Sequence, residues 1–184
     1  WMSEQDGWNH IYLYDLKTGL LKNQITKGEY VVREIQRVDY QNRKIYFMAS
    51  GVDSYMDPYL KQLYSISFDG SNLKLLTPEK ANHDIFFINN PEYFVDSYST
   101  VQLPTTWVIR SIKDGRIIME LEKIDISELK SRGWNPPTPF KIKARDGITD
   151  IYGVIYFPST LDSTKKYPII DESYSGPYII RTPK

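Results

Sequence analysis

The sequence predicts a mainly β fold, and three observations carry this prediction. Ile, Val, Thr, Tyr, Phe and Trp, which favour strands, make up 66 of the 184 residues, whereas Ala appears only three times. A unit made of one strand and one turn recurs three times along the chain. A single short stretch carries the start and stop signals of a helix. We therefore expect antiparallel sheets with little helix.

The recurring unit is an alternating strand that ends in a turn with glycine. Its copies occupy residues 11–19, 63–70 and 107–115, and the terminal glycines Gly19, Gly70 and Gly115 are 51 and 45 residues apart. Asp and Gly near the end of a copy tolerate the positive φ of a tight hairpin turn. Further strand candidates surround the copies: 22–26, 31–38, 44–49, 73–77, 84–88, 93–99 and 116–122. Each complete period then contains four strands.

A four-stranded period of about 40 to 50 residues is typical of a β-propeller blade. The sequence therefore predicts blades at about 29–77 and 82–122, preceded by the outer half of another, or about two and a half four-stranded blades in all. Because this number cannot close a ring, we expect the chain to be an excerpt of a larger protein. The residues expected in the core between the two blades are Ile45, Phe47, Leu63, Ile66, Phe86, Ile88, Phe94 and Val108.

The pattern changes after residue 122. Residues 126–132 predict one short helix, with Asp125 as a possible N-cap and Gly133 as its end. Three prolines between positions 136 and 139 predict a stiff connector, because proline does not fit a sheet interior. We therefore expect residues 123–139 to be a helix and linker between two domains.

Strand patterns return beyond the linker. Strands at 140–144 and 151–157 should pair across the turn Arg145-Asp146-Gly147. A third strand is expected at 167–173, ending in the turn Tyr174-Ser175-Gly176-Pro177.

Composition and charge exclude several classes of protein. The 23 basic residues balance the 23 acidic ones, so the sequence shows no electrostatic footprint for nucleic acid. The absence of cysteine excludes disulfides and thiolate metal sites. The apolar runs are far shorter than the roughly 20 residues that cross a bilayer. We expect no cofactor and no metal.

The two histidines and two serines near the end of the sequence are candidate chemical groups. His10 and His83 have no second ligand at a recognised metal spacing, so we expect hydrogen-bonded structural roles. Ser173 and Ser175 have no histidine nearby in the sequence, so we expect turn or packing roles.

Two other patterns have a structural interpretation. Asp53 and Asp57 are too few oxygen ligands for a calcium loop and are expected in a solvated connection. Trp1, Trp8 and Trp107 could stack on a sugar, but core packing between blades is the expected role.

Several blocks resemble, in the right order, the dipeptidyl peptidase IV branch of the prolyl oligopeptidase family. The blocks that resemble its late propeller are 1–15, 26–30, 75–78 and 93–99, and those that resemble the entry into its α/β-hydrolase domain are 143–147, 165–168 and 174–177. The resemblance implies propeller residues at 1–122, a helix and linker at 123–139, and the first hydrolase strands at 140–184. It also implies a periplasmic or secreted protein that acts on peptide substrates and forms a homodimer.

The activity implied by the resemblance is that of a serine exopeptidase that releases dipeptides with Pro or Ala in second position. In the family, the tyrosine of Tyr-x-Gly-Pro lends its hydroxyl to the oxyanion hole, and the matching residue is Tyr174. The sequence contains no Gly-x-Ser-x-Gly, and both histidines precede the hydrolase segment. This chain alone is therefore expected to be inactive. The alternatives are a propeller that only binds and an inactive homologue of the peptidase.

Overall fold

The structure is a computed structural model that describes residues 1–174 and residue 176. The chain divides into two compact units. Unit 1 comprises Trp1–Tyr98 and Thr105–Lys123, and unit 2 comprises Ser99–Pro104 and Ile124–Lys184.

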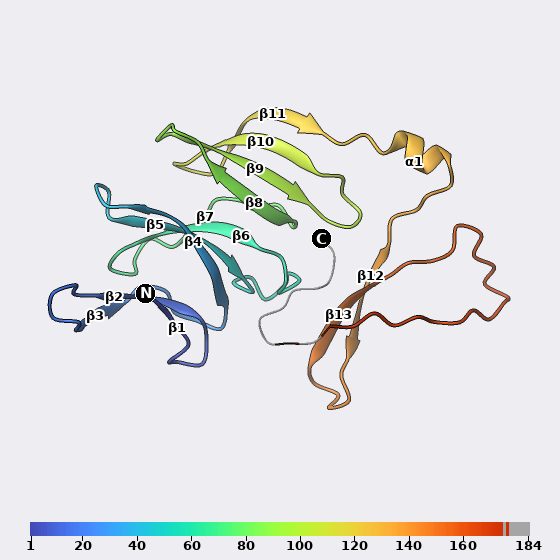
Figure 1. Cartoon of the computed structure of the whole chain (residues 1–184), viewed down its shortest axis with the longest axis horizontal. Helices are drawn as coiled ribbons and strands as arrows, with labels where there is room; N and C mark the ends of the chain where they lie inside the picture. The colour runs from blue at the N-terminus through green and yellow to red at the C-terminus, as the bar shows by residue number, and fades with distance from the viewer. Residues whose placement is uncertain (175, 177–184) are drawn as a thin grey trace. The chain divides into compact units, whose positions relative to one another are not determined.

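Unit 1 is built from antiparallel sheets whose strands follow one another along the chain (Figure 1). The first sheet contains β1 (Met2–Ser3), β2 (His10–Tyr14) and β3 (Leu21–Gln24). The second contains β4 (Val31–Asp39), β5 (Lys44–Ser50), β6 (Gln62–Ser67) and β7 (Lys74–Leu75). The third contains β8 (Asn82–Phe87), β9 (Tyr93–Ser99), β10 (Thr106–Ser111) and β11 (Ile117–Lys123). The two predicted four-stranded meanders are therefore confirmed.

The first sheet has one strand more than the sequence indicates. β1 pairs with β2 through Met2 opposite Ile11 and Ser3 opposite His10. A strand of two residues has no room for an alternating pattern, and so the sequence carries no signal for it.

Two apolar cores lie between the successive sheets of unit 1. One core joins Ile11 and Ile25 of the first sheet region to Phe47 of the second sheet. The other joins Met48 of the second sheet to Phe94 of the third. Because β5 has a core on each face, Phe47 and Met48 are both buried although they point in opposite directions.

The core predicted between the two blades is only partly correct. Phe86 and Ile88 are 58% and 41% exposed. On β8 the inward positions belong to His83 and Ile85, so strand alternation turns Phe86 outward. The other six predicted residues are buried, but Ile45, Phe47 and Ile66 belong to the core between the first and second sheets. Leu63 and Phe94 belong to the core between the second and third sheets, and Val108 is buried on β10.

Glycine turns fix how closely successive sheets approach. Gly70 and Gly115 have φ angles of +85° and +77°, and each lies in the turn between the third and fourth strands of its sheet. A Cβ on Gly70 would lie 2.9 Å from the carbonyl oxygen of Ile25, and one on Gly115 would lie 2.0 Å from that of Leu76. Each turn therefore packs against the end of the preceding sheet at a distance that only glycine permits.

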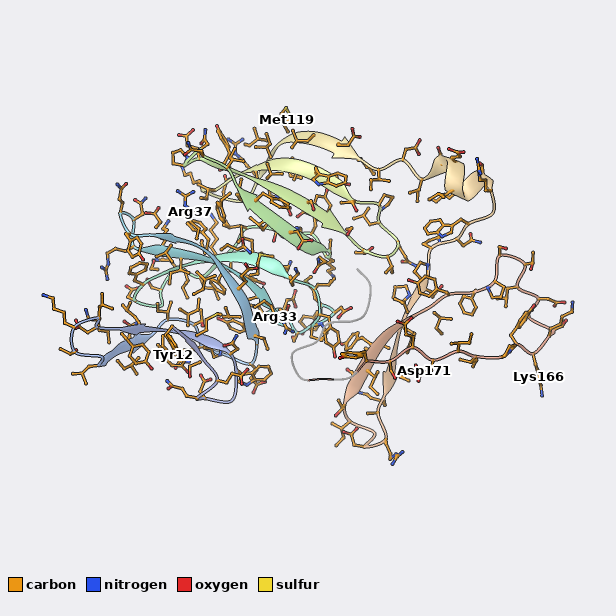
Figure 2. All side chains as sticks on the ribbon, in the orientation of Figure 1. Tyr12, Arg33, Arg37, Met119, Lys166 and Asp171 are labelled. Carbon is orange, nitrogen blue, oxygen red and sulfur yellow. The ribbon has the colours of Figure 1, made fainter. Side chains whose placement is uncertain are left out.

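β11 forms the outer edge of the third sheet and is exposed along its whole length. Its exposed residues include Ile117 and Ile118, and Figure 2 shows the Met119 side chain pointing away from the sheet.

The described part of unit 2 contains one helix and one hairpin. The helix α1 (Ser127–Ser131) lies within the predicted range. The N-cap is Ile126, without a side-chain capping hydrogen bond, so the expectation of Asp125 as the N-cap is wrong by one residue. The Asp125 carboxylate lies just before it and accepts the Ser127 backbone N–H at 2.8 Å, which lowers the pKa of Asp125. Gly133 has a φ of +83°, and the Trp134 N–H donates to the Leu129 carbonyl at 3.1 Å, as in a Schellman motif.

The predicted hairpin forms between β12 (Thr138–Lys143) and β13 (Asp150–Ile155). In its turn the Asp146 carboxylate accepts the backbone N–H groups of Ile148 and Thr149, both at 2.9 Å. β12 begins inside the expected linker and includes Pro139. Proline is tolerated there because both strands of a two-stranded sheet are edges.

The third strand predicted at 167–173 is wrong. Residues 167–174 have no strand, and Ile169 and Ile170 are each 93% exposed. A strand exists through the ladder that it forms with a neighbour, and β12 and β13 pair only with each other among the described residues. Asp171 lies on this irregular segment and Lys166 immediately before it, both after β13 (Figure 2).

Candidate functional site

Tyr174 ends the irregular segment of unit 2. Its side chain is 63% exposed, and Ser173 is also exposed. The predicted turn 174–177 includes Ser175 and Pro177, which lie outside the described residues. The structure therefore gives Tyr174 a position on the surface of its unit.

His10 is completely buried in the first sheet. Its Nδ1 lies 3.0 Å from Thr26 Oγ1, and its Nε2 lies 2.9 Å from the Gly28 carbonyl oxygen. Thr26 Oγ1 also accepts the Ile11 N–H at 2.8 Å. Both ring nitrogens thus have protein partners, which confirms the structural role expected for this residue.

The second sheet repeats this arrangement without a histidine. Thr77 Oγ1 accepts the Leu63 N–H at 2.9 Å, and Gln62 Nε2 donates to the Thr77 carbonyl at 2.9 Å. Gln62 directly precedes Leu63, and His10 directly precedes Ile11. His10 and Gln62 therefore occupy equivalent positions in the first and second sheets.

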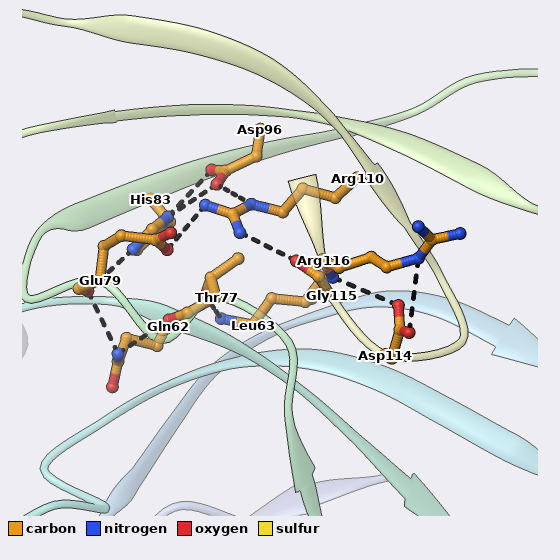
Figure 3. Close-up of polar contacts among 10 residues, drawn as sticks. All are labelled: Gln62, Leu63, Thr77, Glu79, His83, Asp96, Arg110, Asp114, Gly115 and Arg116. Carbon is orange, nitrogen blue, oxygen red and sulfur yellow. Dashed lines mark hydrogen bonds and ion pairs between the residues drawn. The ribbon is translucent and has the colours of Figure 1, made fainter. Parts of the chain in front are cut away.

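Three linked ion pairs in unit 1 form a buried ion cluster of Glu79, His83, Asp96 and Arg110 (Figure 3). Arg110 Nε donates to Asp96 Oδ2 at 2.7 Å, and Arg110 Nη2 donates to Glu79 Oε2 at 2.6 Å. His83 Nδ1 lies 3.0 Å from both carboxylate oxygens of Asp96. His83 Nε2 lies 3.1 Å from the Glu79 carbonyl oxygen.

Burial makes these contacts strong. The side chains of His83 and Asp96 are completely buried, that of Arg110 is 1% exposed, and that of Glu79 is 32% exposed. The Tyr98 ring lies tilted beside His83, with 5.5 Å between the ring centroids, and burial together with the nearby Glu79 charge raises the pKa of Tyr98. Charges in such a place must be paired, because an unpaired buried charge costs several kcal/mol.

His83 and Asp96 are residue types that can form a catalytic dyad, but a catalytic histidine must be accessible and His83 is not. The second ring nitrogen of His83 is already bonded to the Glu79 carbonyl, and no solvent reaches the ring. A general base needs a free nitrogen within reach of a substrate proton. We therefore assign the cluster a structural role, in which it ties the loop after β7 to β8, β9 and β10.

The sequence alone did not reveal three members of this cluster. Glu79, Asp96 and Arg110 are far from one another in sequence, and each is an ordinary charge by itself. One available signal was the alternation of β10, which places Arg110 on the same side as the buried Val108.

The other candidates have no ligand-binding arrangement. Asp53 and Asp57 each accept a backbone N–H two residues further on, at 2.9 Å, as in ordinary turns. Over the described residues, no group of three or more His, Asp or Glu side chains could hold a metal ion. The described part of the chain has no helix long and apolar enough to cross a membrane.

The prediction of core packing is wrong for two of the three tryptophans. Trp1 and Trp8 are 80% and 39% exposed beside the first sheet, while Trp107 is partly buried in the third. Trp1 and Trp8 lie just outside the strands of the first sheet, whereas Trp107 lies on β10 of the third.

Comparison with known proteins gives a consistent family. Residues 1–105 match the model of the dipeptidyl peptidase IV (DPP IV) N-terminal region. The chain is 30% identical over 184 residues to dipeptidyl peptidase 4 of Arthroderma otae and 28% identical over 183 residues to that of Trichophyton rubrum. Each match covers 96% of this chain and 22% of the relative.

Solved structures show the same similarity. The crystal structure of Porphyromonas gingivalis dipeptidyl peptidase 4 matches 91% of this chain with a TM-score of 0.73 and 27% identity. A putative dipeptidyl aminopeptidase IV from Bacteroides ovatus matches with a TM-score of 0.70 at 23% identity, which supports the fold alone. This chain covers 23% and 26% of these two structures. It therefore spans only about a quarter of their length or less.

Proposed function

This chain belongs to the dipeptidyl peptidase IV family, and from that we propose that the protein containing it is a serine-type peptidase that releases N-terminal dipeptides. The observation that carries the proposal is the similarity to dipeptidyl peptidases over 96% of the chain, across both of its units. The proposed second residue of the released dipeptide is Pro or Ala, and the proposed substrates are peptides.

We propose that residues 1–122 end the β-propeller domain, that 123–139 connect the domains, and that 140–184 begin the α/β-hydrolase domain. Consecutive four-stranded sheets with an apolar core on each side of the second support the first assignment. The division of the chain next to residue 123 and the hairpin of β12 and β13 support the others.

Tyr174 is proposed as a donor to the oxyanion hole of the complete enzyme. Its exposed side chain is consistent with a hydroxyl that reaches a substrate. The serine, aspartate and histidine of the triad are proposed to lie outside this chain, which would leave the chain alone inactive. The resemblance also supports export to the periplasm or the exterior and a homodimer as proposals.

The test is a substrate series on the complete protein. Chromogenic dipeptide anilides with Pro, Ala and Gly in second position differ only at the residue that defines the specificity. We expect turnover with Pro and Ala and little with Gly. Equal turnover of all three would contradict the specificity, and no turnover of any would favour an inactive homologue or a propeller that only binds.

A further inference from the structure

The two histidines of this chain are equally buried but differ in the chemistry of their partners. Both rings have a relative exposure of 0%. His10 faces a carbonyl oxygen and the Thr26 hydroxyl, which can donate as well as accept. His83 faces the Glu79 carbonyl and the Asp96 carboxylate.

The partners of His83 have no proton to give. A carbonyl oxygen only accepts, and a carboxylate paired with an arginine also only accepts. Arg110 Nε already donates to Asp96 at 2.7 Å, so the ionised form of that carboxylate is the one in place. Both His83 contacts are therefore hydrogen bonds only when both ring nitrogens carry protons.

The charges around His83 also favour the doubly protonated ring. Asp96 and Glu79 supply two negative charges, and Arg110 supplies one positive charge. The charged His83 ring brings the buried ion cluster to neutrality. In addition, Tyr98 lies 5.5 Å from the His83 ring and 5.7 Å from the Arg110 guanidinium carbon, where an aromatic face favours cations.

His83 lies where the second and third sheets of unit 1 meet. Its backbone N–H donates to the Lys61 carbonyl at 3.0 Å, immediately before β6. The Lys61 side chain in turn pairs with Asp84 at 2.9 Å. Gln62 Nε2 also approaches the Glu79 carbonyl, at 3.4 Å.

We propose that His83 is held as an imidazolium and that its second ring proton acts as a pH-sensitive latch between the second and third sheets. The groups that face it are Asp96 and Tyr98 of β9, Arg110 of β10, and Glu79 after β7, with the Lys61–Asp84 pair at the edge. Loss of the proton leaves one buried contact without a hydrogen bond and the cluster with a net negative charge. The latch therefore holds while both ring nitrogens carry protons and weakens when the second proton is lost.

The first test uses NMR spectroscopy to measure which histidine ring nitrogens carry protons. It is done on the unaltered complete protein labelled with ¹⁵N-histidine. The His83 signals are recognised by their proximity to the Tyr98 ring protons, and those of His10 by their proximity to Tyr30, whose ring centroid lies 5.0 Å away. At neutral pH we expect two protonated nitrogens in His83 and one in His10. A single unprotonated nitrogen in His83 would overturn the proposal.

The second test follows the latch by hydrogen exchange of β8, corrected for the intrinsic effect of pH on exchange. We expect β8 to lose protection over the pH range in which the His83 signals lose the second proton. Unchanged protection over that range would overturn the latch.

Two variants sharpen the second test. In His83→Gln, whose amide has only one donor group for two acceptors, we expect weaker protection that no longer responds to this pH range. His10→Gln is the matched control and should keep the pH response of β8. If β8 in His83→Gln keeps the pH response of the unaltered protein, the proposal is overturned. If His83→Gln does not fold, the histidine NMR spectrum of the unaltered protein decides the question.

Discussion

Arg110 is the residue on which the pairing of buried charge in unit 1 depends. Its guanidinium bonds to Asp96, Glu79 and the Gly115 carbonyl, the last at 2.9 Å. It therefore connects three separate segments of the chain while its side chain is almost completely buried.

Replacement of this arginine is expected to destabilise unit 1 strongly. Arg110→Met keeps the length of the side chain but leaves Asp96 buried with one cationic partner fewer, which typically costs about 3 to 5 kcal/mol. Urea unfolding with hydrogen exchange read out on β9 and β10 measures the change. Lys22→Met, which removes an exposed ion pair with Asp15, is the control and should have little effect. Similar losses in both variants would contradict the importance of burial.

The proposed role of Tyr174 makes a kinetic prediction for the complete protein. Removal of one oxyanion donor typically lowers turnover by about 10² to 10³. We expect Tyr174→Phe to do this with the fold intact, measured with a proline dipeptide anilide and by circular dichroism. Tyr156→Phe is a matched control, because Tyr156 is 67% exposed in the same unit. Unchanged turnover in Tyr174→Phe would remove its proposed role.

At the level of elements, the glycine turns determine the spacing of the sheets. Gly19 and Gly115 both have positive φ, +69° and +77°. A Cβ on Gly19 would meet nothing within 4 Å, whereas one on Gly115 would overlap the Leu76 carbonyl. The same kind of turn is therefore free on one sheet and tightly packed on another.

Replacing each of these two glycines by alanine distinguishes the cost of backbone strain from the cost of steric overlap. Gly19→Ala should cost about 1 to 2 kcal/mol, the usual penalty of a left-handed backbone conformation for a residue with a Cβ. Gly115→Ala should cost clearly more, because the turn must also move away from the second sheet. Denaturant unfolding of the two variants provides the comparison, and equal losses would show that the contact with Leu76 has no energetic weight.

For the whole molecule, the chain is short relative to its relatives, and its sequence contains no Gly-x-Ser-x-Gly motif. It covers 22% of the length of the Arthroderma otae relative. Neither Ser173 nor Ser175 lies in a Gly-x-Ser-x-Gly motif. We therefore propose that the nucleophile lies in another part of the protein.

A covalent probe tests this location. We expect a fluorophosphonate to inactivate the complete protein by labelling one serine outside residues 1–184, because an activated serine needs its base beside it. Mass spectrometry of the digested protein identifies the labelled peptide, and denatured protein serves as the control. A label on Ser173 or Ser175 would contradict the prediction.

Local signals in the sequence were sufficient for most elements. The alternating strands with their glycine turns predicted the two four-stranded sheets, and the segment between Asp125 and Gly133 predicted the place of α1, although its N-cap is Ile126 and not Asp125. The hairpin around Asp146 was also predicted, since its turn bonds lie within a few residues. These features form through contacts between neighbours in the chain, which a sequence displays directly.

The tertiary structure determined those features that depend on partners distant in the sequence, namely which side chains face the core and which segments form strands. Phe86 faces outward because His83 takes the inward side of β8, and His83 does so because Asp96 and Glu79 lie there to receive it. Residues 167–173 have a strand pattern but no adjacent ladder among the described residues. Periodicity shows that a segment can form a strand, but hydrogen bonds and charge pairs between distant segments determine whether it does and which side faces the core.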